Sequence, residues 1–310
     1  MERLSEVSFI LRELGNDAFE SIGSTHLPGF TGIVFGGHIL SLAVKAAALT
    51  LSHSSSDRKL VRLIDAVHSS FIRPVKVAAS VTYKVYNKKD GALFSHRSVS
   101  ALQEGKLVFT CFVSFKSVTG NNQTGKVIYN NQEKPSVPGP GHPECLSPEQ
   151  IRFHDLKNFP FQVYFASPSE WRRKDWDPKD PGAVSPVPMR ARLPVWMKSK
   201  QPVQRVPSYE TNQNNNRLAI LLASDYEFGR LIEIADPYLS WDKFATLNVS
   251  LWFEDTDVNI DQWHLFDMKL LSATKWASNA TLLCMSKIFQ KDGALVATAV
   301  QQGCFIFSKL

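Results

Sequence analysis

The fold follows from a repeated stretch: residues 95–115, SHRSVSALQEGKLVFTCFVSF, are similar to residues 279–305, NATLLCMSKIFQKDGALVATAVQQGCF. Each copy contains two runs of β-forming residues separated by a glycine-containing turn, QEGK in the first copy and QKDG in the second. A short glycine turn between two such runs is typical of a β-hairpin. The sequence therefore predicts the same antiparallel hairpin twice.

The elements before each hairpin also repeat. In the first half a helix predicted from His38 to about Leu51 follows the glycine turn VFGG (34–37). In the second half a helix predicted from Arg217 to about Phe228 follows the asparagine-rich NQNNN (212–216). Four predicted strands follow each helix, over 63–74, 79–91, 93–106 and 107–118 in the first half and over 245–255, 263–275, 280–293 and 294–307 in the second. One helix followed by an antiparallel meander, twice, predicts an α+β fold in which each sheet wraps around its own helix.

The two halves are predicted to be separate domains. The residues between them are rich in Gly, Pro, Asn and Ser, as in PSVPGPGHPE (135–144), which favours a linker over a packed element. We therefore predict an N-terminal domain, a linker or crossover, and a C-terminal domain, over 1–118, 119–150 and 151–310 respectively. Two further predicted strands, over 161–171 and 190–200, extend the second sheet.

Composition limits the class of protein. The chain has 310 residues, of which 44% are hydrophobic and 21% charged, as in ordinary globular proteins. The formal net charge is +6, but Lys and Arg are dispersed and form no basic stripe, which argues against nucleic-acid binding. A mildly basic surface also suits a polyanionic small molecule such as a nucleotide or coenzyme A. No apolar run is long enough to predict a membrane span. The four cysteines form no CxxC pair, which argues against a zinc ribbon and fits a reducing compartment.

The chain ends with Ser308, Lys309 and Leu310. A terminal S-K-L is read by the peroxisomal import receptor. We therefore expect the protein in the peroxisome matrix, with that receptor as a partner. A coincidental surface tail is the alternative.

The segment LLASDYEF (221–228) places one acid, Asp225, in an otherwise apolar predicted helix. At helical spacing four residues share one face: Leu218, Leu221, Leu222 and Asp225. The carboxylate is therefore predicted to face the interior, where burial and the nearby helix C-terminus both raise its pKa. The alternative is a structural acid at a helix end, before a C-cap at Gly229, that reaches solvent or a buried partner. The predicted first-half helix carries no acid, so the two halves differ at this point.

Each half contains its own set of motifs in a fixed order. The first half contains VFGGHILSLAVKAA, HSSFIRP and FSHRSVSALQEGKLVFTCFVSF, and the second contains LLASDYEF, ATLNVSLWF and GALVATAVQQG. These motifs resemble the acyl-CoA thioesterase II family over roughly residues 30–116 and 190–307. The resemblance implies a double-hotdog fold, with two long helices each wrapped by an antiparallel β-sheet, and hydrolysis of acyl-CoA thioesters to free carboxylic acid and coenzyme A. One branch of the family is peroxisomal, in agreement with the terminal S-K-L.

The resemblance also implies a set of catalytic residues. The family's Asp on the second-half helix, its Thr or Ser on the next strand and its Gln on the last strand match Asp225, Thr246 and Gln301. Together these residues are implied to hold and polarise the water that attacks the thioester carbonyl. The chain departs from the family where an Asp-His pair is usual, because it has Asn248 and Val249 there. That departure puts the rate and the substrate preference in question.

The residues can also be weighed without the resemblance. Strand alternation places Gln301 on one face with small and apolar residues, Leu295, Ala297, Ala299, Gly303 and Phe305, and Gln302 on the other face. A buried Gln needs partners for its amide, and a water and the Asp are candidates; an edge strand with two wet faces is the alternative. Thr246 opens a strand of good β-formers and is unremarkable by itself.

Other residues near these motifs are weaker candidates. The Gly36-Gly37 turn at the start of the first helix is a candidate oxyanion or coenzyme A site, because helix N-termini present free backbone N–H groups. His38 and His68 are expected to be structural rather than catalytic. The chain has no G-x-S-x-G motif, which disfavours a serine hydrolase with a nucleophile elbow.

The sequence thus predicts an acyl-CoA thioesterase that needs no metal and no organic cofactor. Within the enzyme class, the alternative is a tailoring thioesterase that releases an unusual acyl chain in a specialised peroxisomal pathway. Outside it, the alternative is a non-catalytic acyl-CoA-binding relative. A homodimer is expected from the resemblance, since hotdog sheets commonly associate.

Overall fold

The structure is a computed structural model that describes residues 9–22, 26–27, 29, 32–51, 60–118, 134–142, 145–146, 159–166, 191–203, 206–235, 241–254, 257–275 and 279–307. Its helices are α2 (Gly36–Leu49), α4 (Tyr209–Ser224) and α5 (Arg230–Ala235). The first-half strands are β1 (Leu11–Gly15), β2 (Ala18–Ser21), β3 (Val61–Phe71), β4 (Val81–Asp90), β5 (Phe94–Gln103) and β6 (Lys106–Val118). The second-half strands are β7 (Cys145–Leu146), β8 (Phe161–Ala166), β9 (Arg192–Ser199), β10 (Lys243–Phe253), β11 (His264–Lys275), β12 (Asn279–Gln290) and β13 (Leu295–Ile306).

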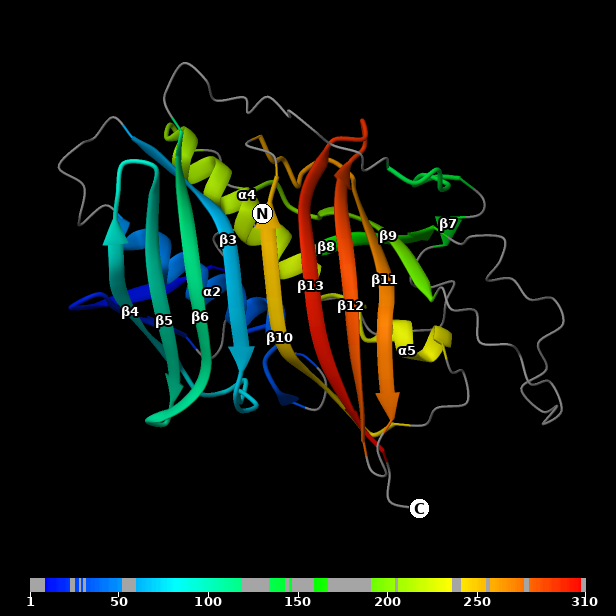
Figure 1. Ribbon diagram of the computed structural model, residues 1–310. Helices are drawn as coiled ribbons and strands as arrows, with labels where there is room; N and C mark the ends of the chain where they lie inside the picture. Colours follow the sequence, from blue (N-terminus) through cyan, green and yellow to red (C-terminus); the bar gives the residue numbers. More distant parts are fainter. Residues whose placement is uncertain are drawn as a thin grey trace, which may run out of the picture.

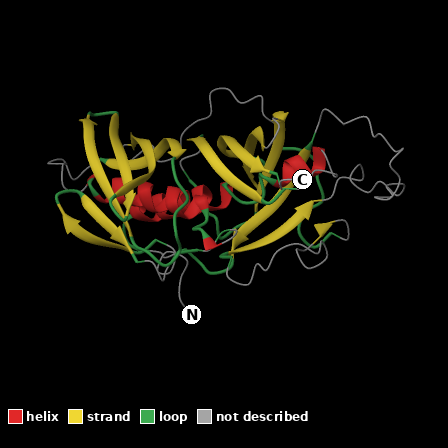
Figure 2. Cartoon of the chain, turned by 90° about the horizontal axis from the view of Figure 1, so that it is seen from below, coloured by secondary structure: helices red, strands yellow, loops and turns green. Residues whose placement is uncertain are grey.

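These strands form one antiparallel sheet of 13 strands in the order β1-β2-β4-β5-β6-β3-β10-β13-β12-β11-β9-β8-β7. The sheet curves around α2 and α4 (Figure 1), and a view from below shows strands on either side of the helices (Figure 2). Within the described ranges, no helix is long and apolar enough to cross a membrane. The predicted strands of both meanders are confirmed, with ends that shift by at most three residues.

Both predicted hairpins are present. The turn between β5 and β6 contains Glu104 and Gly105, with φ angles of 52° and 73°. Two residues with positive φ between paired strands form the type I′ turn that matches the twist of a hairpin. The second turn, between β12 and β13, contains Gly293 with a φ of 106°, a conformation that side-chain-bearing residues rarely adopt.

The two halves of the sheet are joined where β3 pairs with β10. In this register Val67 lies opposite Leu251 and Ser70 lies opposite Asn248. The sequence predicted a sheet around each helix, whereas the structure has one continuous sheet around both. The physical reason is that an unpaired edge strand would expose a row of backbone N–H and C=O groups. Pairing the two edges satisfies those groups and places the two helices side by side.

The predicted start of the second-half helix is wrong. The helix α4 begins at Tyr209 and contains the whole NQNNN segment, which was expected to precede it. Asparagine is disfavoured inside helices because its side chain competes for backbone hydrogen bonds. Here those side chains bond to other segments instead. The Asn214 amide accepts a hydrogen bond from the Ile64 N–H and donates one to the Arg62 carbonyl, each at 2.9 Å.

Neighbouring polar side chains of α4 anchor the loop before β11 in the same way. Gln213 accepts from the Val258 N–H at 2.9 Å, and Asn216 accepts from the Ile260 N–H at 3.0 Å. Each bond satisfies a backbone group outside the helix, so the tertiary structure overrides the low helix propensity of this segment. The helix also ends at Ser224 rather than at Phe228, and Asp225 is its C-cap.

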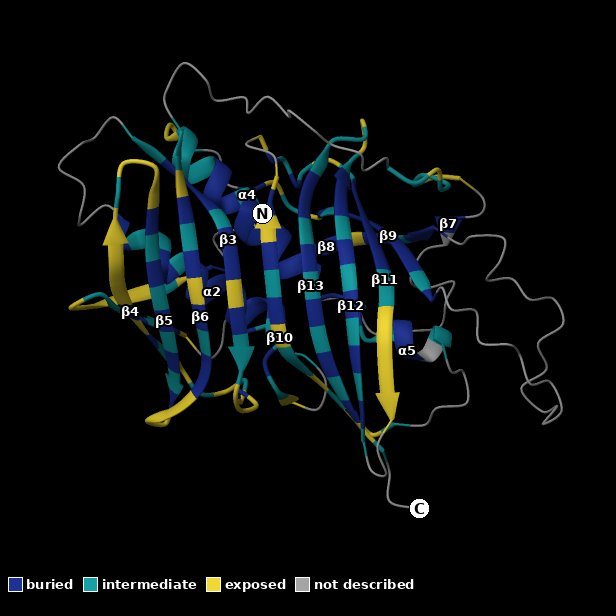
Figure 3. Cartoon of the chain, in the orientation of Figure 1, coloured by how far each residue is buried: buried dark blue, intermediate teal, exposed yellow. Residues whose placement is uncertain are grey.

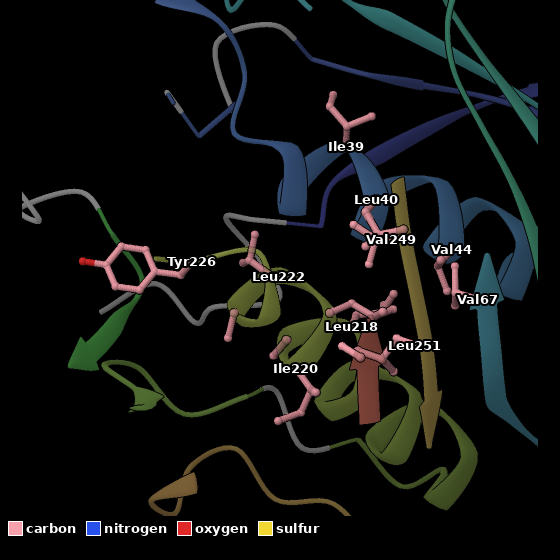
Figure 4. Packing of buried hydrophobic residues seen from close by; sticks show 14 of the residues in the cluster. Ile39, Leu40, Val44, Val67, Leu218, Ile220, Leu222, Tyr226, Val249 and Leu251 are labelled. Carbon is pink, nitrogen blue, oxygen red and sulfur yellow. The ribbon is translucent and has the colours of Figure 1, made fainter. Parts of the chain in front are cut away.

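The core lies between the two helices and the concave face of the sheet. Leu218 of α4 lies beside Leu251 of β10 (Figure 4), and Leu222 of α4, Leu40 of α2 and Val249 of β10 belong to the same cluster of buried residues. Burial alternates along the strands, as expected for a sheet with one covered face (Figure 3). The two helices also share a polar contact, in which the α2 residue Ser41 donates a hydrogen bond to the Leu218 carbonyl at 3.0 Å.

Candidate active site

Asp225 lies where the C-terminal end of α4 meets the N-terminal end of α2. One carboxylate oxygen, Oδ2, accepts a hydrogen bond from the Gly37 N–H at 2.8 Å. The other, Oδ1, accepts one from the Thr246 hydroxyl at 3.1 Å. The carboxylate therefore joins elements from both halves of the chain, and the structure brings together two of the three residues implied to be catalytic.

The glycine turn Gly36-Gly37 packs directly against this carboxylate. A Cβ atom on Gly36 would lie 2.7 Å from Oδ2 of Asp225. A Cβ atom on Gly37 would lie 2.5 Å from the Leu222 carbonyl oxygen and 3.0 Å from the Asp225 Cβ atom. Real Cβ atoms do not approach other atoms this closely, so a side chain at Gly37 would force the backbones apart, and one at Gly36 would displace the Asp225 carboxylate. The turn lets the start of α2 reach the end of α4.

The environment of Asp225 shifts the pKa of its carboxyl group to near neutral pH. Its side chain is buried, and this desolvation raises the pKa from 3.8 to about 7, against the opposing effect of the Thr246 and Gly37 hydrogen bonds. The C-terminal end of α4 disfavours a negative charge, whereas the N-terminal end of α2 favours one. A carboxyl group with a pKa close to the pH of the cell is well suited to accept and release a proton. The raised pKa predicted from the sequence is confirmed.

Gln301 lies on the inward face of β13, one residue pair beyond Thr246. Thr246 is opposite Gly303 in the β10–β13 register, and Val249 is opposite Gln301. The side chain of Gln301 is 1% exposed. Neither its amide nitrogen nor its amide oxygen has a hydrogen-bond partner among the described residues. An unpartnered buried amide on the same inner face as Thr246 is a place for a polar ligand or a water.

The predicted alternation of β13 is confirmed for most of the strand. Residues Ala297, Ala299, Gln301, Gly303 and Phe305 are all buried. Leu295 was expected on the same face but packs in a separate cluster with Trp196 and Phe289. The pairing with β12 is irregular between Ile288 and Phe289, opposite the start of β13, and this irregularity breaks the alternation there.

The departure from the family pattern lies on both faces of β10. Asn248 is exposed on the outer face, where its amide contacts the side chains of Ser70 and Gln302, each at 2.8 Å. Val249 is buried beside Gln301 on the inner face. A register shift between Thr246 and Asn248 inserts one extra residue in the strand, so that Thr246 and Val249 both face inward. The neighbour of Gln301 is therefore apolar.

Both histidines expected to be structural make contacts that fit that interpretation. The buried ring of His38 accepts a hydrogen bond from the Leu27 N–H at 2.9 Å. His68 lies on the outer face of the sheet, 3.0 Å from the Ser250 hydroxyl, with its ring against Trp252. The His68 side chain thus points away from the face that carries Asp225.

Aromatic side chains surround the turn that follows Asp225, a feature that the sequence analysis did not identify. Tyr226 stacks on Phe159 with ring centroids 4.3 Å apart. Phe244 packs against Phe228 and Phe305, and a Cβ atom on Gly303 would lie 2.6 Å from its ring. The aromatic residues in DYEF and KFAT were the available signal, but their mutual contacts involve four separate segments. They keep this end of the site apolar.

The arrangement offers a proton acceptor, two hydrogen-bonding side chains and an apolar surround. Within the described part of the chain, no group of three or more His, Cys, Asp or Glu residues could hold a metal ion. The chemistry that these residues themselves can perform is the activation of a water by a buried carboxylate. Ser308, Lys309 and Leu310 lie outside the described residues.

Comparison with known protein families gives two matches along the chain. A model of the acyl-CoA thioesterase N-terminal domain matches residues 26–116, and one of the acyl-CoA thioesterase C-terminal domain matches residues 146–305. The second match contains Asp225, Thr246 and Gln301, and the first contains the Gly36-Gly37 turn.

Individual proteins show the same similarity. Human acyl-coenzyme A thioesterase 8 is 24% identical over 276 residues, which cover 87% of this chain and 79% of the human protein. A peroxisomal acyl-coenzyme A thioester hydrolase of Saccharomyces cerevisiae is 33% identical over 81 residues, or 26% of this chain and 21% of the yeast protein. A hot dog fold protein of unknown function from Alicyclobacillus acidocaldarius superposes with a TM-score of 0.69 at 16% identity, covering 100% of both chains. That likeness shows the fold.

Proposed function

The chain belongs to the acyl-CoA thioesterase family and is a thioester hydrolase, and from that premise we propose that it hydrolyses acyl-CoA through a water held by Asp225, Thr246 and Gln301. The observation that carries the proposal is the buried Asp225 carboxylate, which is bonded to Thr246 and to the start of α2. The unpartnered Gln301 amide on the same inner face supports it.

The proposed reaction needs few groups. The water oxygen attacks the thioester carbonyl carbon while Asp225 accepts a proton from the water. The C–S bond then breaks, and coenzyme A leaves as a thiolate. Because a free thiol has a pKa of about 8.5, the thiolate is a good leaving group without a strong general acid. The protonated Asp225 returns its proton to the thiolate or to solvent.

The Gly36-Gly37 turn has a part in this proposal. The Gly37 N–H holds Asp225, so the carboxylate stays aligned when it is ionised. The positive end of α2 lies at the same point and favours the negative charge that develops on the thioester oxygen. Gln301 has both a donor and an acceptor free to orient the water or the carbonyl group.

The pH dependence of thiol release tests this function. We expect kcat/KM for acyl-CoA hydrolysis to rise with pH and to level off above an apparent pKa near 7. The reason is that burial raises the pKa of Asp225 to about 7, and only the ionised carboxylate can accept a proton. The measurement is the release of free thiol from an acyl-CoA panel between about pH 5 and about pH 9.

Two results would count against the proposal. A rate independent of pH across this range would mean that Asp225 is not the base. Binding of acyl-CoA without thiol release above background would support the alternative, a non-catalytic acyl-CoA-binding relative.

We also propose that the chain consists of two hotdog domains. In this view α2 and α4 are the central helices of two hotdog units within one chain, over 1–118 and 151–310, joined by a crossover over 119–150. The separate family matches to the two halves support this division. A homodimer and the absence of any metal or organic cofactor stay predictions.

We propose the peroxisome matrix as the location, with the import receptor as partner. The terminal Ser308-Lys309-Leu310 and the similarity to a yeast protein named as peroxisomal support this proposal. Deleting these three residues from a fluorescently tagged protein is expected to leave it in the cytosol, whereas the intact protein colocalises with a peroxisomal marker. The tag belongs at the N-terminus, so that the S-K-L end stays free. Import of the truncated protein would contradict the proposal.

A further inference from the structure

A second unpartnered polar group lies near Gln301. The hydroxyl of Ser286, on the neighbouring strand β12, has no hydrogen-bond partner among the described residues. Ser286 and Gln301 are each 1% exposed, and both belong to the inward face of the sheet. Buried polar groups in native proteins almost always have a partner. Three unpartnered polar atoms, two on Gln301 and one on Ser286, are therefore available to a water or to a ligand with polar atoms of its own.

The strand register sets these two residues at opposite corners of a small rectangle. Gln301 is opposite Cys284, and Ser286 is opposite Ala299. Directly opposed Cβ atoms in an antiparallel pair are about 5 Å apart and diagonal ones about 7 Å, which the long Gln side chain spans in part. The other two corners carry small side chains, Ala299 and Cys284.

These four positions continue the inner face of the sheet from the candidate active site toward the start of β13. Asp225 bonds Thr246, which lies opposite Gly303 on β13. Gln301 is the next inward residue of β13, and Ala299, opposite Ser286, is the one after it. Ser286 is therefore farther along the sheet from Asp225 than Gln301 is.

Of the two parts of an acyl-CoA, only the acyl chain suits this buried inner face. The phosphates of coenzyme A are charged, and burying them without partners is costly, so this part of the substrate stays near solvent. The acyl chain is the apolar part and takes the buried side. Small, buried residues, Ala299 and Ala297, continue the inward face of β13 beyond Gln301. If the acyl chain of the proposed substrate runs along this face, Ser286 lies beside its first carbons.

A hydroxyl group at this position is unfavourable for an ordinary acyl chain. A chain made only of methylene groups would cover the Ser286 hydroxyl without offering it a hydrogen bond. An acyl chain with its own oxygen would satisfy it, since a serine hydroxyl can donate to a keto oxygen and can donate to or accept from a hydroxyl. A site built to bond a substrate hydroxyl also discriminates strongly against the analogue that lacks it.

Building on the proposed function, we propose that Ser286 and Gln301 form a subsite for an oxygen atom on the acyl chain. The preferred substrates are then acyl-CoA thioesters that carry a hydroxyl or keto group close to the thioester. This substrate class fits the tailoring role that was kept as an alternative. It also fits the apolar Val249 beside Gln301, because Val249 leaves the Gln301 amide available to the substrate.

The test compares two substrates of equal chain length, 3-hydroxyoctanoyl-CoA and octanoyl-CoA, in the full-length protein. We expect wild type to hydrolyse the hydroxyacyl substrate with at least a tenfold higher kcat/KM. In Ser286→Ala this preference is expected to fall at least tenfold. The matched control is Ser199→Ala, which removes another buried hydroxyl in the same half, one that donates to Asp261 at 2.7 Å. Ser199→Ala should keep the wild-type preference.

Several results would overturn the subsite. If wild type hydrolyses the two substrates with equal kcat/KM, the subsite is wrong, whatever the variants show. If Ser286→Ala lowers kcat/KM equally for both substrates, the Ser286 hydroxyl binds a resident water or supports the fold and does not bind the acyl oxygen. If wild type hydrolyses neither substrate, the proposed function fails together with the subsite. Hydrolysis without a preference leaves that function standing and removes the subsite alone.

Discussion

Replacing Asp225 with asparagine is expected to lower kcat for acyl-CoA hydrolysis by about 10²- to 10⁴-fold, the usual contribution of a general base. Asparagine has nearly the same shape but cannot accept a proton from the water. It also has only one acceptor oxygen, so it cannot accept from both the Gly37 N–H and the Thr246 hydroxyl. The measurement is steady-state thiol release at a pH above 7, where wild-type Asp225 is ionised.

The matched control is Asn248→Ala on the strand that carries Thr246. The Asn248 side chain lies on the outer face of the sheet, bonded to Ser70 and Gln302, and does not reach Asp225. We expect its kcat to stay within about twofold of wild type, because surface substitutions away from special features have small effects. If Asp225→Asn kept full activity, the water-activation mechanism would be wrong even though the enzyme class stands.

Asp225→Asn should also be more stable than wild type at high pH. Burial raises the pKa of Asp225 from 3.8 to about 7 in the folded protein, so between these values the folded state binds more protons than the unfolded state. Its contribution to stability is therefore fully present below about pH 4 and is lost progressively as the pH rises to about 7. At about 1.4 kcal/mol per pKa unit, ionising Asp225 costs the fold about 4 kcal/mol. The difference in Tm between variant and wild type should grow from pH 5 to 8.

The hairpins and the acid were predictable because their signals are local. Positive φ at the turn before β13 requires glycine, and Gly293 stands in the sequence beside a run of β-forming residues. Asp225 stands out because its neighbours Leu221 and Leu222 are apolar and buried. In each case a few adjacent residues contain the whole signal.

The features that were missed depend on partners far away in the chain. The start of α4 was misplaced because Asn214 finds its hydrogen-bond partners, Arg62 and Ile64, about 150 residues earlier. The pairing of β3 with β10 likewise joins edges that no local pattern connects. The proposed role of Ser286 depends on its register opposite Ala299. Strand alternation alone shows only that Ser286 shares a face with Cys284.

Gly37→Ala is expected to have the largest effect on stability of any single methyl group added to this site. The new Cβ atom would lie 2.5 Å from the Leu222 carbonyl oxygen, a backbone atom in the middle of the contact between α2 and α4. Relieving this overlap requires the helices to separate, which costs about 1–3 kcal/mol or more. Urea denaturation of the variant and wild type measures the change. Because the Gly37 N–H holds Asp225, kcat should fall as well.

Gly139→Ala is the control, since a Cβ atom there would have no atom within 4 Å. Its stability should stay within about 0.5 kcal/mol of wild type or rise slightly, because alanine restricts the unfolded chain. Gly36→Ala separates the two roles of the turn. Its Cβ atom would meet the Asp225 carboxylate oxygen at 2.7 Å, and a side chain can move where a helix backbone cannot. We therefore expect Gly36→Ala to lose more activity than stability, and Gly37→Ala to lose both. Equal, small losses in all three variants would mean that the two helix ends are not held together through this turn.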